Sequence, residues 1–173
     1  MRVRLAVLGA PGPGASPGPE LVCAIQRGLP APLQAAEPVE LLLDLEPCRD
    51  GVRGQVDAGC LVDRLPPPPP GWTLLGLTGA DLFLPALTHV FGASRLGQRR
   101  GVLSWARLGD PPERLGRRLL VEAVHELGHS AGLVHCPVGD CAMHRTLWPE
   151  GIDLKRPDYC PGCRAALEGL EGP

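Results

Sequence analysis

Three histidines and a glutamate stand at a spacing that suits metal-dependent hydrolysis, in the run His125-Glu-Leu-Gly-His129-Ser-Ala-Gly132-Leu-Val-His135. Residues four apart share one face of a helix, so His125 and His129 can direct their imidazoles at one ion. Gly132 stands where the helix must break, because glycine enters the left-handed conformation at little cost. That break would return the chain so that His135 supplies a third ligand. Three protein ligands leave one position of a catalytic zinc open for water.

Glu126 lies about a third of a helical turn from His125, close to such an ion and free to act as a base. Zinc lowers the pKa of its water from ~15.7 to ~7, which yields a nucleophile at neutral pH. We expect Glu126 to take the water's proton and to pass it to a departing amine. The other two histidines lack this spacing. We interpret His89 as a strand residue and assign no role to His144.

Four of the seven cysteines crowd the C-terminal quarter of the chain in two close pairs: Cys136, Cys141, Cys160 and Cys163. Four thiolates so arranged are typical of a structural tetrahedral zinc site. Such a site would join the loop after His135 to the C-terminal tail and hold that histidine in place. A redox-active CxxC and two disulfides are the alternatives. The scattered Cys23, Cys48 and Cys60 are interpreted as small buried hydrophobes.

The elements that position these groups follow a β-α-β-α-β order over the first half of the chain. Strand patterns cover residues 2–8, 39–45 and 72–77, and helical patterns cover 19–29 and 55–65. This order predicts a largely parallel sheet with helices packed on it. Further strand patterns at 88–94 and 101–108 predict an antiparallel hairpin. A helix opened by residues 110–112 carries the histidines, and a short helix is expected near 164–170. The five prolines 66–70 are interpreted as a stiff surface connection rather than a ligand for a proline-binding module.

Composition narrows the class of protein. A chain of 173 residues with 44% apolar residues favours one domain with a sizeable core. A net charge of −2 indicates neither nucleic acid nor an anionic membrane surface as a partner. The apolar run at residues 5–8 is too short for an export signal, and no stretch is long enough to span a bilayer. We therefore expect a cytoplasmic monomer.

The string from His125 to His135 resembles the signature of the metzincins, zinc peptidases that also carry a methionine in a turn beneath the metal. The run His135-Cys136-x4-Cys141-Ala-Met143, followed by Cys160-x-x-Cys163, resembles the archaemetzincins, a small family with an added four-cysteine zinc site. The likeness extends to Arg53-Gly-Gln55, Asp81-Leu-Phe83, Val90-Phe-Gly92, Ser104-x-x-Arg107-Leu108 and Asp153-x-Lys155. The chain departs from the family pattern at His144-Arg145 and at Val56.

The resemblance implies two zinc ions per chain. The ligands would be His125, His129 and His135 for the catalytic ion and the four cysteines for the structural ion, with Glu126 as general base and Met143 as the Met-turn residue. It also implies a zincin-like α/β fold, with a mixed, mostly parallel, twisted five-stranded sheet, an antiparallel edge strand at 88–94, flanking helices and an active-site helix. The N-terminal lobe would cover about residues 1–132 and a small C-terminal lobe about 133–173.

The function so implied is hydrolysis of peptide bonds in peptides or unfolded proteins, by an aminopeptidase or a limited endopeptidase. The alternative is a non-catalytic, zinc-stabilised module that binds peptides without cleaving them. The intact Glu126 argues against this alternative, because a purely structural site needs no carboxylate there.

Overall fold

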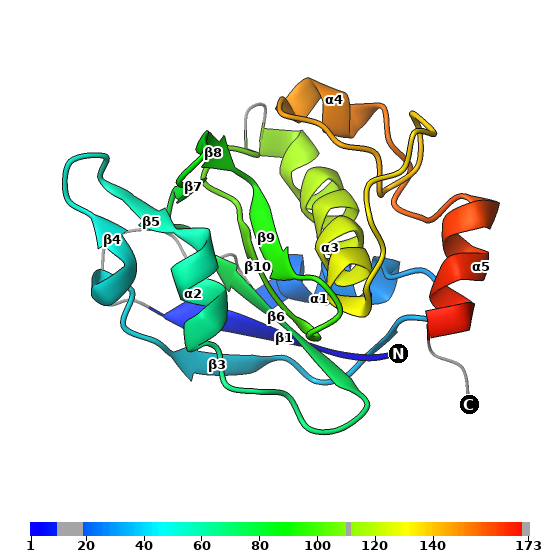
Figure 1. Ribbon diagram of the computed structural model, residues 1–173, viewed down its shortest axis with the longest axis horizontal. Helices are drawn as coiled ribbons and strands as arrows, with labels where there is room; N and C mark the ends of the chain where they lie inside the picture. Colours follow the sequence, from blue (N-terminus) through cyan, green and yellow to red (C-terminus); the bar gives the residue numbers. More distant parts are fainter. Residues whose placement is uncertain (10–18, 110–111, 171–173) are drawn as a thin grey trace.

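A twisted mixed sheet forms the centre of the molecule in the computed structural model, which describes residues 1–9, 19–109 and 112–170 (Figure 1). Its strands are β1 (Arg2–Gly9), β2 (Gln34–Ala35), β3 (Val39–Leu42), β6 (Trp72–Thr78), β9 (Gly92–Arg95) and β10 (Arg100–Ser104). The order is β2-β1-β6-β10-β9, and β3 pairs with β1 beyond the end of β2. The sheet is therefore five strands wide. Only β9 runs antiparallel to its neighbour, so the predicted mostly parallel sheet with an antiparallel edge is confirmed.

Helices cover both faces of this sheet. The helices α1 (Pro19–Gly28) and α3 (Leu115–Ala131) lie on one face, and α2 (Ala58–Arg64) lies on the other (Figure 1). Successive side chains of a strand point to opposite faces. Accordingly, Val3 and Leu5 of β1 join the core with α1 and α3, whereas Ala6 and Leu8 join the core with α2. All four side chains are buried.

A second, smaller sheet has the order β4-β5-β7-β8 and was not predicted. Its strands are β4 (Arg49–Asp50), β5 (Gln55–Asp57), β7 (Leu82–Leu84) and β8 (Leu87–Val90). Two sequence predictions need correction here. The helix predicted over 55–65 begins only at Ala58, because residues 55–57 form β5, which pairs with β4 and β7. The Asp57 carboxylate accepts a hydrogen bond from the Cys60 backbone N–H at 3.1 Å and so caps the start of the helix. The strand predicted over 88–94 is divided at Phe91, since β8 pairs with β7 and β9 pairs with β10.

The remaining predictions of elements hold with small shifts of their ends. The hairpin of β9 and β10 is antiparallel, and β10 ends at Ser104 rather than at residue 108. Two short 3-10 helices occur at Glu46–Cys48 and Pro112–Arg114, the second leading into α3, which begins at Leu115. Residues 110 and 111, where this helix was predicted to open, lie outside the described residues. After α3 come α4 (Pro149–Asp153), which was not predicted, and α5 (Pro161–Leu170). The prolines 66–70 connect α2 to β6. None of the helices in the described ranges has the length and apolar character that crossing a membrane requires.

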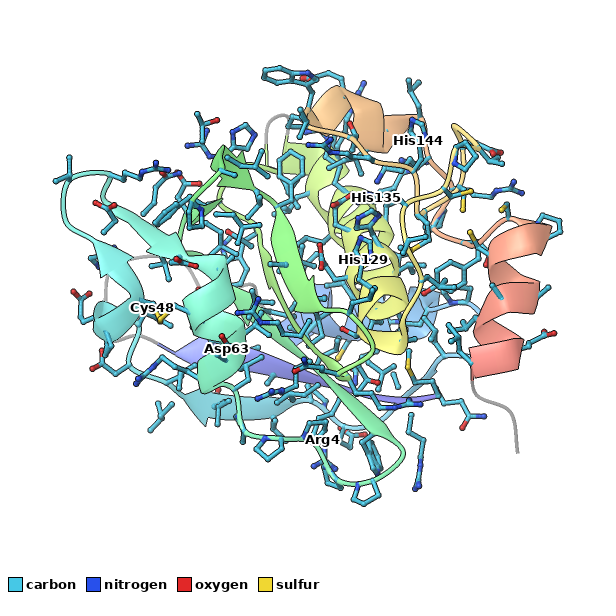
Figure 2. All side chains as sticks on the ribbon, viewed as in Figure 1. Arg4, Cys48, Asp63, His129, His135 and His144 are labelled. Atoms are coloured by element: carbon cyan, nitrogen blue, oxygen red, sulfur yellow. A yellow bond between two sulfur atoms is a disulfide. The ribbon has the colours of Figure 1, made fainter. Side chains whose placement is uncertain are left out.

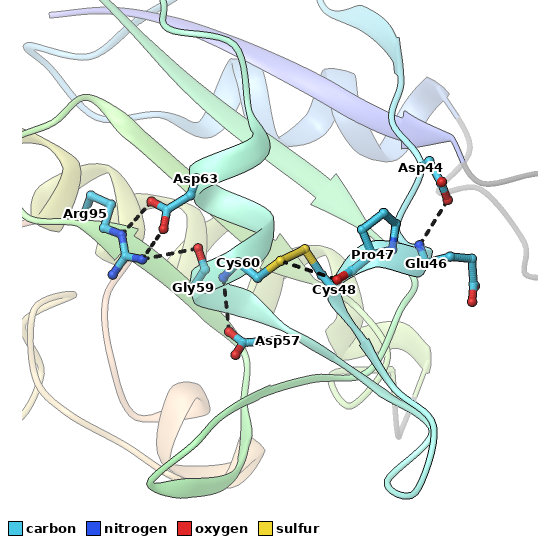
Figure 3. The surroundings of a disulfide bond; sticks show 9 residues. All are labelled: Asp44, Glu46, Pro47, Cys48, Asp57, Gly59, Cys60, Asp63 and Arg95. Carbon is cyan, nitrogen blue, oxygen red and sulfur yellow. Dashed lines mark hydrogen bonds and ion pairs between the residues drawn. A yellow bond between two sulfur atoms is a disulfide. The ribbon is translucent and has the colours of Figure 1, made fainter.

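Cys48 and Cys60 form a disulfide, which corrects the interpretation of both as small buried hydrophobes (Figure 3). The bond joins the 3-10 helix Glu46–Cys48 to α2. The Cα atoms of the two cysteines lie 5.6 Å apart. That distance lies in the range that disulfides span. The pairing follows from the packing of the two helices, which the spacing of the cysteines does not reveal. Cys23 is a free, partly buried thiol.

Candidate active site

The helix α3 presents the two histidines of its last turns on one face, and its end turns the chain back toward them. Gly132 has φ of 114°, and its N–H bonds to the carbonyls of Gly128 and His129 at 3.1 and 2.9 Å. The next N–H, from Leu133, also bonds to the Gly128 carbonyl at 2.9 Å. This glycine-terminated end satisfies the last carbonyls of the helix. It brings His135 beside His129, with ring centroids 4.8 Å apart, as the predicted break requires (Figure 2).

Backbone carbonyls hold the two helical imidazoles by their Nδ1 atoms. His125 Nδ1 lies 2.7 Å from the Ala142 carbonyl oxygen, and His129 Nδ1 lies 2.7 Å from that of Leu133. A carbonyl oxygen only accepts, so Nδ1 carries the proton in each ring and Nε2 presents a lone pair. Burial lowers the pKa of both histidines, and of His135, which keeps the imidazoles neutral. Neutral rings are the form that binds a metal ion.

The arrangement of the imidazole nitrogens fits a tetrahedral cation. One ring nitrogen from each of His125, His129 and His135 lies within 4.8 Å of the other two. The Nε2 atoms of His125 and His129 are 3.1 Å apart with no proton to share between them. Zinc–nitrogen bonds of ~2.05 Å at tetrahedral angles place two ligand nitrogens ~3.3 Å apart. Converging lone pairs at this distance repel one another unless a cation lies between them.

Glu126 lies next to this cluster and is held by the edge strand. Its side chain is buried, and Oε2 accepts a hydrogen bond from Ser94 Oγ of β9 at 2.7 Å. Ser130 Oγ donates in turn to Ser94 Oγ at 3.2 Å. Burial raises the pKa of the Glu126 carboxyl to about 8, against the Ser94 hydrogen bond, which lowers it. A divalent cation bound beside it would lower this pKa again through its charge. Ser94 carried no signal in the sequence.

A buried ion pair lies behind the histidines and involves the only lysine of the chain. Lys155 Nζ donates to Glu122 Oε1 at 2.9 Å and to the Ala142 carbonyl at 3.4 Å. The same carbonyl orients His125, so the lysine and the imidazole share one acceptor. Burial raises the pKa of Glu122, whereas the charge of Lys155 lowers it. Lys155 was named above only as part of the family resemblance and was given no role. That it is the single lysine of the chain could have marked it as a residue of interest.

The four C-terminal cysteines also converge. Their sulfur atoms lie within 4.8 Å of one another, and all four are free thiols. Cys136 Sγ and Cys160 Sγ are 3.7 Å apart, close to the ~3.8 Å that a tetrahedral ion with zinc–sulfur bonds of ~2.3 Å requires. Backbone N–H groups of Val138 and Cys160 point at the sulfurs of Cys136 and Cys141 at 3.5 and 3.3 Å. Such donors stabilise thiolates, and the Cys163 N–H is the main cause that lowers the pKa of Cys160 to about 7.

Met143, predicted as the Met-turn residue, packs against α3. It is fully buried, and a Cβ built on Gly128 of α3 would meet its sulfur at 2.3 Å, so the contact requires glycine. The Met143 carbonyl accepts the Cys136 N–H at 2.9 Å, which joins this turn to the cysteine loop. His144 follows with Nδ1 3.1 Å from the Cys136 carbonyl, outside the histidine cluster. Tyr159, judged a poor candidate from sequence, is buried with its hydroxyl donating to the Val124 carbonyl at 2.8 Å.

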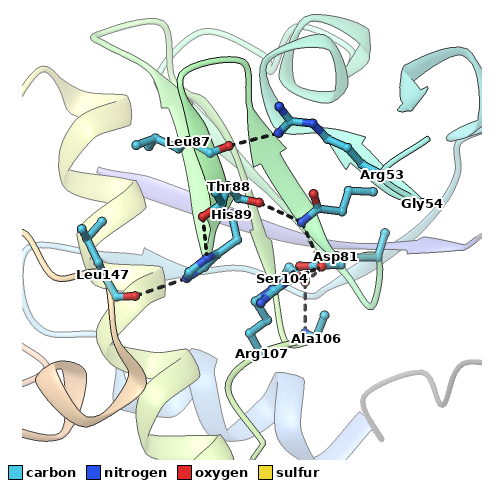
Figure 4. A network of polar contacts seen from close by, with 12 residues as sticks. Arg53, Gly54, Asp81, Leu87, Thr88, His89, Ser104, Ala106, Arg107 and Leu147 are labelled. Carbon is cyan, nitrogen blue, oxygen red and sulfur yellow. Dashed lines mark hydrogen bonds and ion pairs between the residues drawn. The ribbon is translucent and has the colours of Figure 1, made fainter. Parts of the chain in front are cut away.

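The histidine cluster lies at the base of a cleft of about 290 Å³. The strands β8 and β9 line one wall, and residues 145–147 line the other. A polar network holds the first wall in place (Figure 4). Arg107 binds both carboxylate oxygens of Asp81 at 2.6 Å, and Gln55 Nε2 donates to Asp81 Oδ2 and to the Thr88 carbonyl at 3.0 and 3.1 Å. These residues, quoted above only for their resemblance to a family, thus position β8.

His89 of β8 connects the two walls. Its Nε2 lies 3.2 Å from the Leu147 carbonyl oxygen, across the cleft (Figure 4). Its ring also packs near Phe91 and Trp148, with centroids 5.7 and 6.3 Å apart. His89 is a strand residue as predicted, but the structure places it in the wall of the cleft. Sequence reasoning missed this position because Leu147 lies 58 residues further along the chain.

Neutral histidines converging on a cation position, a buried glutamate beside them and an open sheet edge along a cleft define a zinc metallopeptidase. The model of peptidase family M54 matches residues 69–169. An archaemetzincin from Methanopyrus kandleri is 42% identical over 119 residues, which cover 68% of each chain. One from Archaeoglobus fulgidus is 36% identical over 121 residues, which cover 69% of this chain and 73% of the relative.

Solved structures agree with this assignment. The crystal structure of the Methanopyrus kandleri archaemetzincin matches with a TM-score of 0.85 at 32% identity, over 99% of this chain and 95% of the other. That of the Archaeoglobus fulgidus archaemetzincin, complexed with malonate, matches with a TM-score of 0.78 at 29% identity, over 95% of this chain and 99% of the other. The chain belongs to peptidase family M54, and its resemblance to the archaemetzincins is confirmed.

Proposed function

We propose that this metallopeptidase hydrolyses peptide bonds with Glu126 as its general base. His125, His129 and His135 would hold the catalytic zinc through the nitrogens that converge at the base of the cleft. When bound, zinc supplies a Lewis acid that acidifies water and polarises the scissile carbonyl. The observation that carries the proposal is the position of Glu126, which is buried beside the three imidazoles and is not needed by their geometry.

The contacts of Glu126 give its two oxygens separate tasks. Oε2 accepts the Ser94 hydroxyl at 2.7 Å, which fixes the carboxylate and leaves Oε1 for the transferred proton. In the proposed step Oε1 accepts a proton from the attacking water and then donates it to the leaving amine. The hydrogen bond from Ser130 to Ser94 at 3.2 Å extends the support to α3 itself. Because this carboxylate is already oriented, little conformational entropy is lost on reaching the transition state.

A second zinc at Cys136, Cys141, Cys160 and Cys163 is part of the proposal. Its role would be structural, because four thiolates fill a tetrahedral shell and leave no open position. The Cys136 backbone binds the turn of Met143 and His144, and the carbonyl of the preceding Ala142 contacts His125. Zinc at the cysteines would therefore stabilise the floor of the active site. It would also anchor His135, which precedes Cys136 directly.

The proposed substrates are peptides or unfolded segments, bound in extended form along the free edge of β9. The cleft volume of about 290 Å³ and the His89–Leu147 hydrogen bond across it favour a short stretch of chain. Cleavage by an aminopeptidase or by a limited endopeptidase suits these dimensions.

The test is zinc content together with cleavage of a diverse quenched-peptide library, in wild type and in Glu126→Gln. We expect two zinc ions per chain in both proteins and a kcat about 10²–10⁴-fold lower in the variant. Glu168→Gln, an exposed glutamate of α5, is the matched control and should keep full activity. Equal turnover in Glu126→Gln and wild type would eliminate Glu126 as the base. Peptide binding without turnover in zinc-loaded wild type would favour the non-catalytic module instead.

A further inference from the structure

Arg145 stands in the wall of the cleft on a backbone that the cysteine loop holds in place. Two residues earlier, the Met143 carbonyl accepts the Cys136 N–H at 2.9 Å. The intervening His144 binds with its own N–H to the Cys141 carbonyl at 2.9 Å and with Nδ1 to the Cys136 carbonyl at 3.1 Å. Arg145 directly follows this hydrogen-bonded turn and lines the cavity that contains His125, Glu126 and His135. Its backbone position is thus fixed relative to the reaction centre.

Among the charged side chains that line the cleft, Arg145 is the one without a hydrogen-bond or ion-pair partner in the described residues. Of the other charged groups that line the cavity, Lys155 is paired with Glu122 at 2.9 Å, and Glu126 is bound by Ser94. Arg145 is exposed and has no hydrogen bond or ion pair with any residue of the ranges that the structure describes.

A free guanidinium in a site that binds peptides selects for a carboxylate. Its five N–H donors form a planar fork that matches the two oxygens of a carboxylate. The rest of the cavity wall contributes mainly apolar side chains, among them Leu84, Leu87, Phe91 and Leu147. These surfaces accept an apolar side chain but offer no partner for a negative charge. Apart from the proposed zinc ion, Arg145 is therefore the one unpaired positive group that the described lining residues offer to a carboxylate.

We propose that Arg145 is a specificity-determining residue that binds a substrate carboxylate near the scissile bond. The inference rests on the proposed peptidase function and adds the class of substrate. Arg145 lines the same cavity as His135 and Glu126, so its guanidinium can reach a group of a substrate whose scissile bond lies at the histidine cluster. That carboxylate comes either from the C-terminus of a short peptide or from an Asp or Glu side chain.

The test uses four versions of one peptide that the wild-type enzyme cleaves. One pair differs in a C-terminal acid or amide, and the other differs in Glu or Gln beside the cleaved bond. We expect kcat/KM of wild type to be about tenfold higher for the acidic member of one pair, which identifies the source of the carboxylate. Arg145→Ala should reduce that ratio to about twofold or less, and Arg145→Lys should keep part of it.

Arg27→Ala is the control for loss of one positive charge, because Arg27 is exposed in the last turn of α1 and does not line the cavity. It should keep the wild-type ratio. A ratio near one in the wild type, or a ratio that Arg145→Ala leaves unchanged, would overturn the proposal.

Binding separates this proposal from the peptidase function. The same four peptides are titrated calorimetrically into zinc-loaded Glu126→Gln, with and without Arg145→Ala. We expect about tenfold tighter binding of the acidic peptide, lost in the double variant. If the wild type cleaves no peptide, the peptidase function fails, and the binding ratio alone decides the role of Arg145. Equal binding of acid and neutral peptides, or no binding of either, refutes that role.

Discussion

Replacing Lys155 with methionine tests how the C-terminal segment is tied to the active-site helix. Lys155 and Glu122 form an ion pair of 2.9 Å, and their side chains are only 1% and 5% exposed. The lysine also donates to the Ala142 carbonyl at 3.4 Å, which is the acceptor that orients His125. Methionine has a similar length and no charge, so it removes both bonds with little change in packing.

The expected loss follows from the buried carboxyl that remains. Removing one partner of a buried ion pair costs about 3–5 kcal/mol. Burial already raises the pKa of Glu122, so the orphaned carboxyl becomes protonated more readily than an exposed one, which limits the penalty. We therefore expect the free energy of unfolding to fall by about 3 kcal/mol. For a chain of this length that corresponds to a decrease in Tm of about 6–12 °C.

Urea denaturation of zinc-loaded protein measures this change, with the slope of the transition checked for two-state behaviour. The matched control is Arg95→Met, which breaks the Arg95–Asp63 ion pair at the surface, with side chains 42% and 54% exposed (Figure 3). That variant should lose less than about 1 kcal/mol. Combining Lys155→Met with Glu122→Gln should recover part of the loss, because no unpaired charge remains. A loss below about 1 kcal/mol in Lys155→Met would refute the reasoning that the orphaned Glu122 carboxyl is costly.

Two further predictions concern pH and the cysteine cluster. The Arg118 hydrogen bonds, with help from Arg114, lower the pKa of Asp153 to about 2, so the stability they provide is present above pH ~4 and is lost as the pH falls through 2. Asp153→Asn should therefore lower the free energy of unfolding by about 1 kcal/mol at pH 6, after allowance for solvent at Arg114. In denaturant titrations the difference from wild type should shrink to a small fraction of this value by pH 2. A difference at pH 2 as large as that at pH 6 contradicts this assignment. Cys163→Ser should reduce zinc from two ions per chain to one and lower the Tm, as metal analysis and calorimetry would report, and two retained ions would exclude the four-cysteine site.

The histidine cluster was predictable because its geometry is local. His125 and His129 are one turn apart on α3, and Gly132 ends that helix within the same eleven-residue run. Helical periodicity and the left-handed preference of glycine act over three or four residues, so spacing alone predicts which imidazoles converge. The β-α-β-α-β order of the first half was readable for the same reason, since each element is specified by its own pattern. The roles of these histidines as ligands stay a prediction until zinc is measured.

The surroundings of the cluster were decided by tertiary structure. Ser94 reaches Glu126 from 32 positions away in the chain, and Lys155 reaches Glu122 from 33. The pairing of Cys48 with Cys60 and the division of the 88–94 strand at Phe91 likewise depend on which elements pack together. No local pattern encodes such contacts, because a side chain's own neighbours in sequence do not determine what a distant strand or loop presents to it.

The sequence by itself thus determined the reacting groups and the helix that carries them. The packing of β9 and of the 141–155 segment against α3 determined what holds and orients those groups. The Ser94 hydroxyl binds Glu126, the Ala142 carbonyl binds the His125 imidazole, and the Lys155 ammonium binds Glu122. It also determined that the arginine after the methionine turn faces the cleft. The physical reason is that burial and long-range hydrogen bonds arise only when the whole chain is folded, whereas helix periodicity is already a property of the unfolded sequence.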